Sequence, residues 1–316
     1  MRLLLLLATL PLLAADSTRI WDSAPHNAFT DLIHHKGEWL CVFREGRAHV
    51  STDGAIRVIA SRDGVKWTSK ALLKNAALDL RDPKITLTPK GELMLTAAAA
   101  QREKDGQSPV PHDTLAWFSR DASTWSEPIK IGDHNFWLWR VGWHRGMAYS
   151  VGYETMSRAG ITRLYASKDG RKFDAHVPTF QTENFPNESS ILFKKDGTAL
   201  CLLRRDGGSR TALLGTSKPP YKDWQWKDLG VRIGGPHFVE TANGRLIGAV
   251  RLHDGKTRTA IVEIDAAAGT LKELAPLPSS GDSSYAGLVW RKGELWISYY
   301  ASHEGKSSIY LARWKP

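Results

Sequence analysis

Cysteine is scarce in this sequence, which argues against a disulfide-rich or a zinc-binding protein. The 316 residues include two cysteines, Cys41 and Cys201, and each lies in an apolar run, where a free thiol packs as a small hydrophobic side chain. A disulfide scaffold or a zinc site is therefore not expected. Metal-ligand spacing, a phosphate-binding loop and a nucleophile elbow are also missing, so we expect no metal ion and no cofactor.

Long hydrophobic runs are missing beyond the N-terminus. Residues 1–15 combine Arg2 with a leucine-rich run and end in Ala14-Ala15, a pattern typical of a secretory signal peptide. The run is too short to cross a bilayer, and no later segment approaches the roughly 20 apolar residues that a spanning helix needs. We therefore expect a secreted or periplasmic protein without membrane insertion, with one domain over residues 16–316.

The sequence also lacks a run of consecutive basic residues. The net charge is +10, but lysine and arginine are scattered along the chain and alternate with acidic residues. Binding to nucleic acid is therefore not expected. The charge predicts only a general attraction toward anionic substrates.

Aromatic residues and turn formers are abundant, and they recur with a period. The chain holds 13 Trp, 27 Gly and 15 Pro. An apolar run, a turn closing on glycine and a second apolar run form a β-hairpin pattern that occurs six times. The turn glycines are Gly37, Gly91, Gly146, Gly197, Gly244 and Gly293, at separations of 54, 55, 51, 47 and 49 residues. Units of about 50 residues with about four strands predict an all-β fold, a β-propeller of six four-stranded antiparallel blades.

A second marker follows the first four hairpins. It reads Ser61-Arg-Asp-Gly-Val-Lys-Trp67 in the first unit, recurs from Ser119 and Ser167, and is degenerate from Ser217. The aspartate is expected to accept hydrogen bonds from the turn, the glycine to take a positive φ, and the aromatic ring to pack on its own blade. The sixth unit ends before such a turn, so we expect the segment near Arg19 to Trp21 to complete it and cover the open edge.

These turns resemble the Asp boxes, or BNR repeats, of the sialidase (neuraminidase) superfamily, whose catalytic domains are six-bladed propellers. The resemblance covers nearly all of residues 16–316 and implies an exo-acting, retaining glycoside hydrolase that releases a terminal sialic acid or a related acidic sugar. An acidic glycan or glycoconjugate is the implied partner, and we expect a monomer. Fold does not fix activity, so two alternatives stand: a non-catalytic carbohydrate-binding propeller, and a glycosidase of this fold with a different sugar.

Two positions of the repeat collect polar side chains. Six to nine residues before the turn glycines stand Asp31, Asp82, Arg140, Glu188, His237 and Tyr285, and seven residues after them stand Arg44, Ala98, Tyr153, Arg204, Arg251 and Tyr300. Since the first strand of each blade lines the channel, we expect these side chains to meet at one mouth and form a binding or catalytic site.

Three segments that contribute residues to this expected site resemble sialidase segments. The stretch from Asn187 to Arg204 looks like the sialidase segment that opens with a glutamate and ends with a substrate-binding arginine. The Tyr285-Ala-Gly-Leu288 stretch looks like the segment with the nucleophile, and the stretch from Arg258 to Asp265 looks like one with another arginine of the carboxylate-binding triad, a role for which Arg251 competes. The resemblance thus implies Tyr285 as nucleophile, Glu188 as its base, and Arg44, Arg204, Arg251 and Arg258 as the carboxylate clamp.

A tyrosine nucleophile suits a sugar with a carboxylate on its anomeric carbon, because a neutral phenol avoids like-charge repulsion. Sialidases are exceptions to the two-carboxylate rule of glycosidases for this reason. A free phenol, with a pKa of about 10, is a poor nucleophile, and a neighbouring carboxylate would activate it.

The sequence departs from the sialidase pattern in two places. Residues 25–31 replace the Arg-Ile-Pro motif that supplies the first triad arginine, so either Arg44 substitutes or the clamp is incomplete. The role of the acid/base aspartate is assigned to Asp53, with Asp31 and Asp82 as alternatives.

Arg81, with its neighbours Asp82-Pro-Lys84, resembles a segment of five-bladed furanosidases, but six hairpins argue against that fold. His49, His26 and His303-Glu304 complete the expected lining, although a lone histidine is more often structural.

Overall fold

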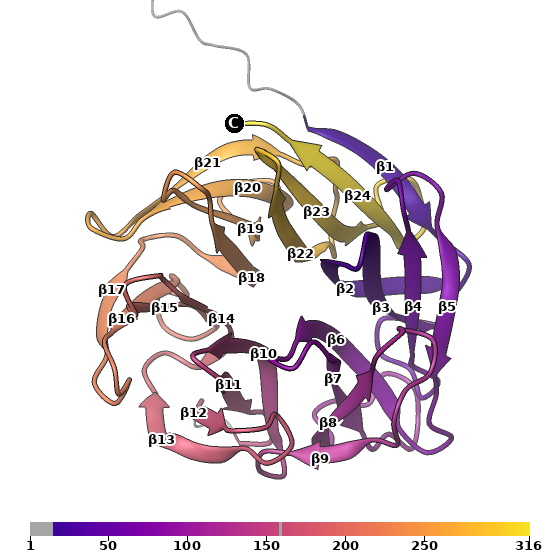
Figure 1. Ribbon diagram of the computed structural model, residues 1–316, viewed down its shortest axis with the longest axis horizontal. Helices are drawn as coiled ribbons and strands as arrows, with labels where there is room; N and C mark the ends of the chain where they lie inside the picture. The colour runs from indigo at the N-terminus through magenta and orange to yellow at the C-terminus, as the bar shows by residue number, and fades with distance from the viewer. Residues whose placement is uncertain (1–14, 158–159) are drawn as a thin grey trace, which may run out of the picture.

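The structure, a computed structural model, describes residues 15–157 and 160–316 and consists of six four-stranded antiparallel sheets around a central axis (Figure 1). This confirms the all-β, six-bladed propeller. The predicted signal peptide lies outside the described residues except for Ala15. Among the described residues, no helix is long and apolar enough to cross a membrane.

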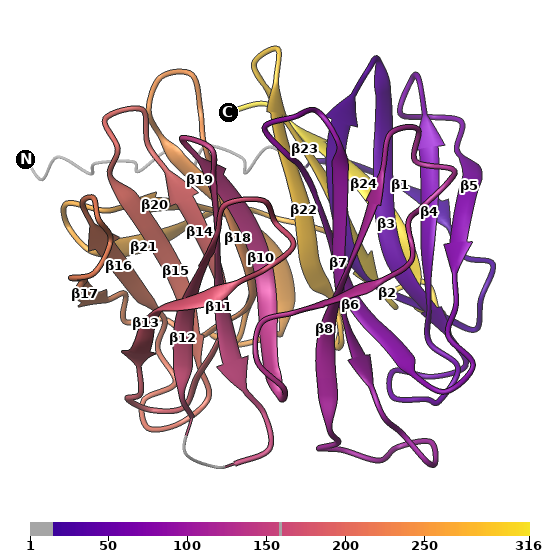
Figure 2. The same cartoon turned by 60° about the horizontal axis from the view of Figure 1, so that its bottom comes forward.

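Each blade runs from an inner strand at the axis to an outer strand at the rim, and the strands pass between the two faces of the ring (Figure 2). From the inside outward the blades are β2 (His26–His35), β3 (Glu38–Gly46), β4 (Ala55–Ser61) and β5 (Thr68–Leu73); β6 (Asp79–Leu87), β7 (Leu93–Ala100), β8 (His112–Ser119) and β9 (Ile129–Ile131); β10 (Phe136–His144), β11 (Met147–Glu154), β12 (Thr162–Ser167) and β13 (Asp174–Gln181); β14 (Pro186–Phe193), β15 (Ala199–Arg205), β16 (Leu213–Ser217) and β17 (Gln225–Asp228); β18 (Ile233–Glu240), β19 (Leu246–Leu252), β20 (Arg258–Asp265) and β21 (Thr270–Pro276); and β22 (Ser284–Arg291), β23 (Glu294–Ala301), β24 (Ser308–Trp314) and β1 (Asp16–Trp21).

The sixth blade is completed by the N-terminal strand, as the sequence predicted. β1 pairs antiparallel with β24, with Asp16 opposite Arg313 and Arg19 opposite Tyr310. The two ends of the chain therefore share one sheet, and the strand that would otherwise be an open edge is covered.

Apolar side chains fill the spaces between neighbouring blades. Val42 and Val58 of the first blade pack with Leu80 and Leu95 of the second in one buried cluster. Cys41 is a buried free thiol, as is Cys201. The core is therefore a ring of inter-blade layers, which leaves the axis for polar side chains.

The Ser-x-Asp turns have the expected hydrogen bonds and connect the third and fourth strands at the rim. In the first of them Asp63 Oδ1 accepts from the backbone of Val65 and Lys66, and Ser61 Oγ accepts from Gly64. Gly64 has φ +75°, and Trp67 donates its indole N–H to the Gly64 carbonyl. The turns from Ser119 and Ser167 repeat the bonds to the aspartate and the serine.

Candidate functional site

All six inner strands carry the same irregularity near their start. In each inner hairpin the pairing register breaks and two residues bulge out of the ladder. The paired residues that flank each break are 28 and 31, 81 and 84, 138 and 141, 186 and 189, 234 and 237, and 284 and 287. A bulge bends its strand and re-aims its side chains. A sixfold set of bulges thus directs side chains from every blade toward one site.

The bulges correct the alignment made by counting from the turn glycines. The first bulge residue is Tyr285 in the sixth blade, Asp82 in the second, Phe29 in the first and Gly235 in the fifth. Asp31 and His237 instead follow their bulges. The count failed partly because its window of six to nine residues was too wide: Phe29 and Tyr285 both lie eight residues before their glycines, whereas Asp31 lies six before. The hairpin turns also differ in length, with two residues at Gly37 but five from Thr88 to Glu92.

Tyr285 and Glu188 lie in contact at the centre of this ring. The Tyr285 hydroxyl donates to Glu188 Oε1 over 2.5 Å, and Arg204 Nη1 lies 2.8 Å from the same carboxylate oxygen and 3.2 Å from the phenol oxygen. The backbone N–H of Gly235 donates to Glu188 Oε2 at 2.8 Å. Three blades, the fourth, fifth and sixth, therefore meet around one proton, that of the Tyr285 hydroxyl, with a buried carboxylate as its acceptor.

The surroundings keep Tyr285 neutral. Enclosure by protein, followed by the negative charge of Glu188, raises the pKa of Tyr285 far above its usual value, while Arg204 and Arg251 act in the opposite direction. The phenol is therefore a hydrogen-bond donor at any ordinary pH. It can act as a nucleophile only if its proton passes to Glu188 as the new bond forms.

The backbone that carries Tyr285 is strained. Ser284 has φ +85° and Tyr285 has φ +50°, and non-glycine residues avoid this region unless their surroundings impose it. Thr30 Oγ1 donates to the Tyr285 carbonyl at 3.0 Å, and the carbonyl of Ala286 accepts from His237 Nδ1 at 3.0 Å and from Arg140 Nη2 at 3.4 Å. Side chains of three other blades therefore hold the two carbonyls at this turn.

A charged layer of the inner strands surrounds these contacts. Asp31 accepts from Arg140 Nη1 with both oxygens, at 2.9 and 2.8 Å, and from the backbone of Leu32 and Ile85. The amine of Lys84 lies 3.3 Å from the Thr30 carbonyl. Burial, followed by the charge of Arg140, lowers the pKa of Lys84 to about 8.

Arg251 and Arg81 bring further positive charge to the mouth. The Arg251 guanidinium lies 5.1 Å from the centre of the Tyr285 ring and donates to Tyr300 and to Asp282. Arg81 lies 5.0 Å from the ring of Phe29, whose edge contacts the ring of Tyr285. With Arg204, these two arginines could bind an anionic group above Tyr285.

Two predicted clamp arginines lie elsewhere. Arg44 has no exposed surface; it pairs with Asp79 at 2.8 Å and donates to the Ala48 carbonyl, which leaves it no route to a ligand. Arg258 pairs with Asp254 and with Glu273 of the outermost strand β21. The structure thus keeps Arg44 in a buried ion pair and engages Arg258 with carboxylates away from the axis, whereas Arg81 lies beside the mouth, although it too pairs with Asp79.

The three candidate acids have very different surroundings. Asp53 is exposed and pairs with Arg47 at 3.4 Å, and Asp31 is held by Arg140. Asp82 is 5 % exposed, has φ +49°, and its buried Oδ1 has no hydrogen-bond partner among the described residues. Burial raises the pKa of Asp82 to about 6, with Glu188 acting in the same direction and Lys84, Arg81 and His49 opposing it. Asp82 is therefore the carboxyl best suited to hold a proton near neutral pH.

Aromatic residues on the third blade were missed as site residues. Trp139 lies edge-on to Tyr285, with ring centres 5.6 Å apart, and Trp137 stacks on Tyr153 at an angle of 8°. Tyr153 stood in the second repeat position but was not assigned a role. The sequence signal was weak, because aromatic residues are common in every strand.

The other predicted lining residues are divided between the mouth and the rim. His49 bonds to Asp282 at 2.6 Å, and its ring lies near that of His26. The ring of His303 lies 4.7 Å from that of Tyr310 at an angle of 39°, and Glu304 pairs with Arg19 of β1. His303 and Glu304 therefore belong to the closure of the sixth blade.

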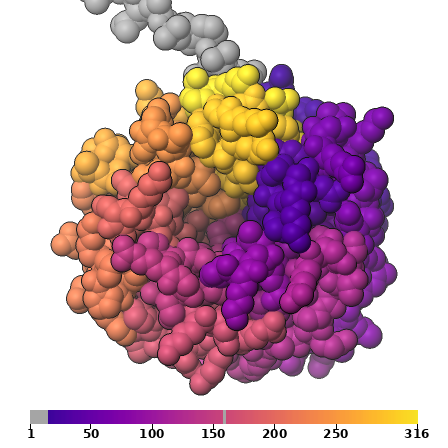
Figure 3. Space-filling model, viewed as in Figure 1, coloured from indigo at the N-terminus to yellow at the C-terminus, as the bar shows by residue number. Residues whose placement is uncertain are grey.

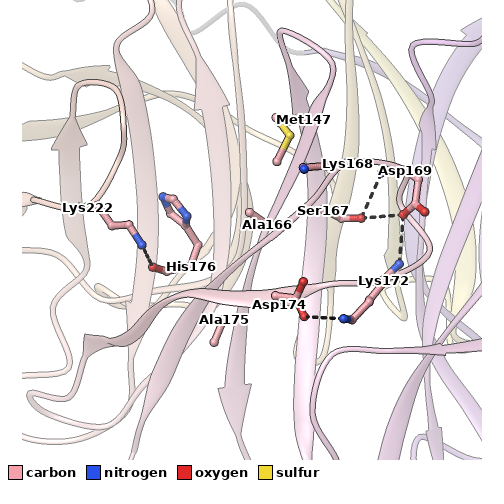
Figure 4. Close-up of a pocket in the computed structure, with 10 residues that line it drawn as sticks. All are labelled: Met147, Ala166, Ser167, Lys168, Asp169, Lys172, Asp174, Ala175, His176 and Lys222. Carbon is pink, nitrogen blue, oxygen red and sulfur yellow. Dashed lines mark hydrogen bonds and ion pairs between the residues drawn. The ribbon is translucent and has the colours of Figure 1, made fainter.

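Surface cavities also occur away from the axis. One of about 440 Å³ lies at the rim of the third blade, where Lys168, Lys172, Asp174, His176 and Lys222 surround it (Figure 4). Lys172 pairs with Asp174, and Lys222 donates to the His176 carbonyl. The middle of the ring is hollowed in the space-filling view (Figure 3).

Comparison with solved structures shows where this architecture recurs. A protein of unknown function from Dyadobacter fermentans superposes with a TM-score of 0.82 at 18% identity, over 96% of this chain and 99% of that one. An α-L-arabinanase from Penicillium chrysogenum, complexed with arabinobiose, gives a TM-score of 0.73 at 13% identity, over 96% and 98%. The fold is shared with propeller glycosidases.

A sialidase belongs to the same set of structures. That of Trypanosoma rangeli superposes with a TM-score of 0.73 at 13% identity, over 96% of this chain and 60% of its own. This chain thus spans less than two thirds of that enzyme, and identities this low establish the fold alone. No protein-family model matches the sequence, and no curated protein sequence does.

Proposed function

We propose that the protein is a retaining glycoside hydrolase that uses Tyr285 as its nucleophile and acts on a terminal sugar with a carboxylate. The observation that carries the proposal is the 2.5 Å hydrogen bond from the Tyr285 hydroxyl to Glu188. A phenol bonded to a carboxylate, beside an arginine and at the mouth of a propeller, is the arrangement a tyrosine nucleophile requires.

In the first step the Tyr285 oxygen attacks the anomeric carbon while its proton moves to Glu188. The bond to the leaving oxygen breaks, and that oxygen takes a proton from Asp82. In the second step Asp82, now a carboxylate, removes a proton from water, and the water oxygen attacks the same carbon. The bond to Tyr285 breaks and Glu188 returns the proton, so both groups regain their starting state and the sugar keeps its configuration.

The charge around the site supports an acidic substrate. Arg204 and Arg251 lie near a neutral phenol, Arg81 lies against the ring of Phe29 beside it, and guanidinium groups suit a carboxylate. Asp82 replaces Asp53 as the proposed acid because it is buried with a raised pKa, whereas Asp53 is exposed and ion-paired.

A neutral sugar is the second candidate, because the clamp is partly occupied. Arg204 already pairs with Glu188 and Asp206, and Arg251 with Asp282. Arabinanase and arabinofuranosidase structures share the fold. A substrate without a carboxylate would leave these ion pairs intact.

The test is a screen of the purified protein against aryl glycosides of sialic acids, other nonulosonic acids, uronic acids and arabinofuranose. We expect release from one of the acidic glycosides, with the first product retaining the anomeric configuration by NMR. Tyr285→Phe should abolish release, whereas Tyr299→Phe, which removes a buried phenol bonded to Ser17 and the Pro278 carbonyl, should not. Equal activity in Tyr285→Phe would refute the mechanism, and release of arabinofuranose alone would favour the neutral sugar.

A further inference from the structure

Three potential metal ligands converge at the channel mouth from separate parts of the chain. His26 begins β2, His49 follows β3 and Asp282 precedes β22, and one donor atom from each lies within 4.8 Å of the other two. Their spacings in the sequence, 23 and 233 residues, match no metal-binding motif, so no sequence pattern predicted this group.

Each donor is free, or can be freed, to bind an ion. His26 Nδ1 is buried and has no hydrogen-bond partner among the described residues. His49 Nδ1 and Asp282 Oδ2 lie 2.6 Å apart and share one proton, which an ion could replace if His49 keeps its own proton on Nε2. The histidine side chains lie edge to face, with ring centres 5.5 Å apart.

The carboxylate is already oriented by neighbours that are not ligands. Asp282 Oδ1 accepts from Arg251 Nη2 at 2.8 Å and from the Tyr300 hydroxyl at 2.6 Å, which leaves Oδ2 toward the histidines. Hydrogen bonds that fix a ligating carboxylate are typical of metal sites.

We propose that His26, His49 and Asp282 bind a divalent transition-metal ion, with zinc as the best match. Two imidazoles and one carboxylate suit Zn²⁺ or Co²⁺, whereas Ca²⁺ and Mg²⁺ prefer a full set of oxygen ligands. Three protein ligands leave a fourth position for water or for a ligand oxygen. The nearby Arg251 charge opposes a cation, so binding is weaker than at a structural zinc site.

This site does not depend on the proposed glycosidase activity. The ion would lie beside the site, because Arg251 contacts both Asp282 and the face of the Tyr285 ring. It would add positive charge at the mouth without touching Glu188.

Titration calorimetry of EDTA-treated, dialysed protein with Zn²⁺, together with Co²⁺ absorption spectra, tests the proposal. We expect one Zn²⁺ per chain and visible Co²⁺ bands of a four-coordinate site. His49→Ala and His26→Ala should each weaken binding at least tenfold. His49 is about half exposed, so its loss should leave the fold intact.

His134→Ala is the matched control. His134 also bonds to an aspartate, Asp113, at 2.8 Å and is about half exposed, but it belongs to no such three-ligand group in the described part of the chain. Its removal should leave Zn²⁺ affinity unchanged. The proposal is wrong if Zn²⁺ does not bind at millimolar concentration, or if the His26 and His49 variants bind it as well as the unchanged protein does.

Discussion

The Tyr285 hydroxyl donates a 2.5 Å hydrogen bond to Oε1 of Glu188, although 97 positions separate the two residues. They sit at the bulges of two different inner strands, β22 and β14, with the fifth blade between them. The fifth blade contributes Gly235, whose N–H binds the other oxygen of Glu188 and whose Cα lies against Tyr285. A side chain at position 235 would meet the Tyr285 backbone, so glycine allows the two groups to approach.

Glu188→Gln should reduce kcat about 10³-fold on the aryl glycoside found by the screen. The amide keeps the shape of the side chain but cannot take the phenol proton, and base catalysis typically contributes factors of 10² to 10⁴. Steady-state kinetics measures the effect, with Glu263→Gln as the control, because that glutamate pairs with Arg245 at the rim of the fifth blade. A loss smaller than tenfold would mean that Glu188 is not the base.

Asp82→Asn should reduce turnover and stabilise the fold at neutral pH. The pKa of Asp82 rises to about 6 on folding, so the folded state binds the proton more tightly, and the free energy of unfolding falls as pH rises from about 4 to 6. Above pH 6 the ionised carboxylate costs up to about 3 kcal/mol, which the amide avoids. Urea unfolding at pH 7 and pH 4 checks this: the variant should gain stability at pH 7 and little at pH 4.

The same group sets the expected pH dependence of activity. The acid form of Asp82 donates to the leaving group, so kcat/KM should fall as pH rises above about 6. Lys84, Arg81, Glu188 and His49 are the charged or titratable groups that face it. With a substrate whose leaving group departs without a proton, the step that breaks the glycosidic bond should not depend on pH in this way. A profile that stays flat from pH 5 to 8 on both kinds of substrate would assign the acid role elsewhere.

Thr30→Val should lower kcat roughly tenfold with little change in KM. The threonine hydroxyl donates to the carbonyl of Tyr285 and accepts from Ser298, and valine has the same shape without the hydroxyl. Without that bond the strained turn can relax and move the phenol. Thr30→Ser should restore the rate, which separates positioning from packing. If both variants retain full kcat, the bond does not hold the turn.

Asp79 is expected to matter more for stability than any arginine around it. Its buried carboxylate binds Arg44, Arg81 and Arg102 at 2.7–3.3 Å. Asp79→Asn leaves three guanidinium groups without their counter-charge and should cost about 3–5 kcal/mol. Arg44→Met leaves Asp79 with two partners and should cost clearly less. Urea unfolding of both variants gives the comparison, and equal losses would contradict it.

The sequence predicted those features of the structure that the repeat determines. It did not predict those that depend on the bulges in the inner strands. Hairpin spacing predicted six blades, and the missing outer strand predicted that β1 closes the ring. The contact between Tyr285 and Glu188 followed from the repeat and from the sialidase resemblance together. The clamp did not follow, because burial decides whether an arginine such as Arg44 faces a ligand or an internal aspartate. The metal-ligand group could not be predicted, since its three residues meet only when the first and last blades join.

Closure of the ring by β1 fixes the order in which the molecule can be completed. β1 is synthesised long before its partner β24, so it stays unpaired until β24 has left the ribosome. Until then the core between the first and sixth blades lacks Ile309 and Leu311 of β24. The junction of the first and sixth blades is therefore the last part of the propeller to be completed, and a chain that ends before β24 leaves it open.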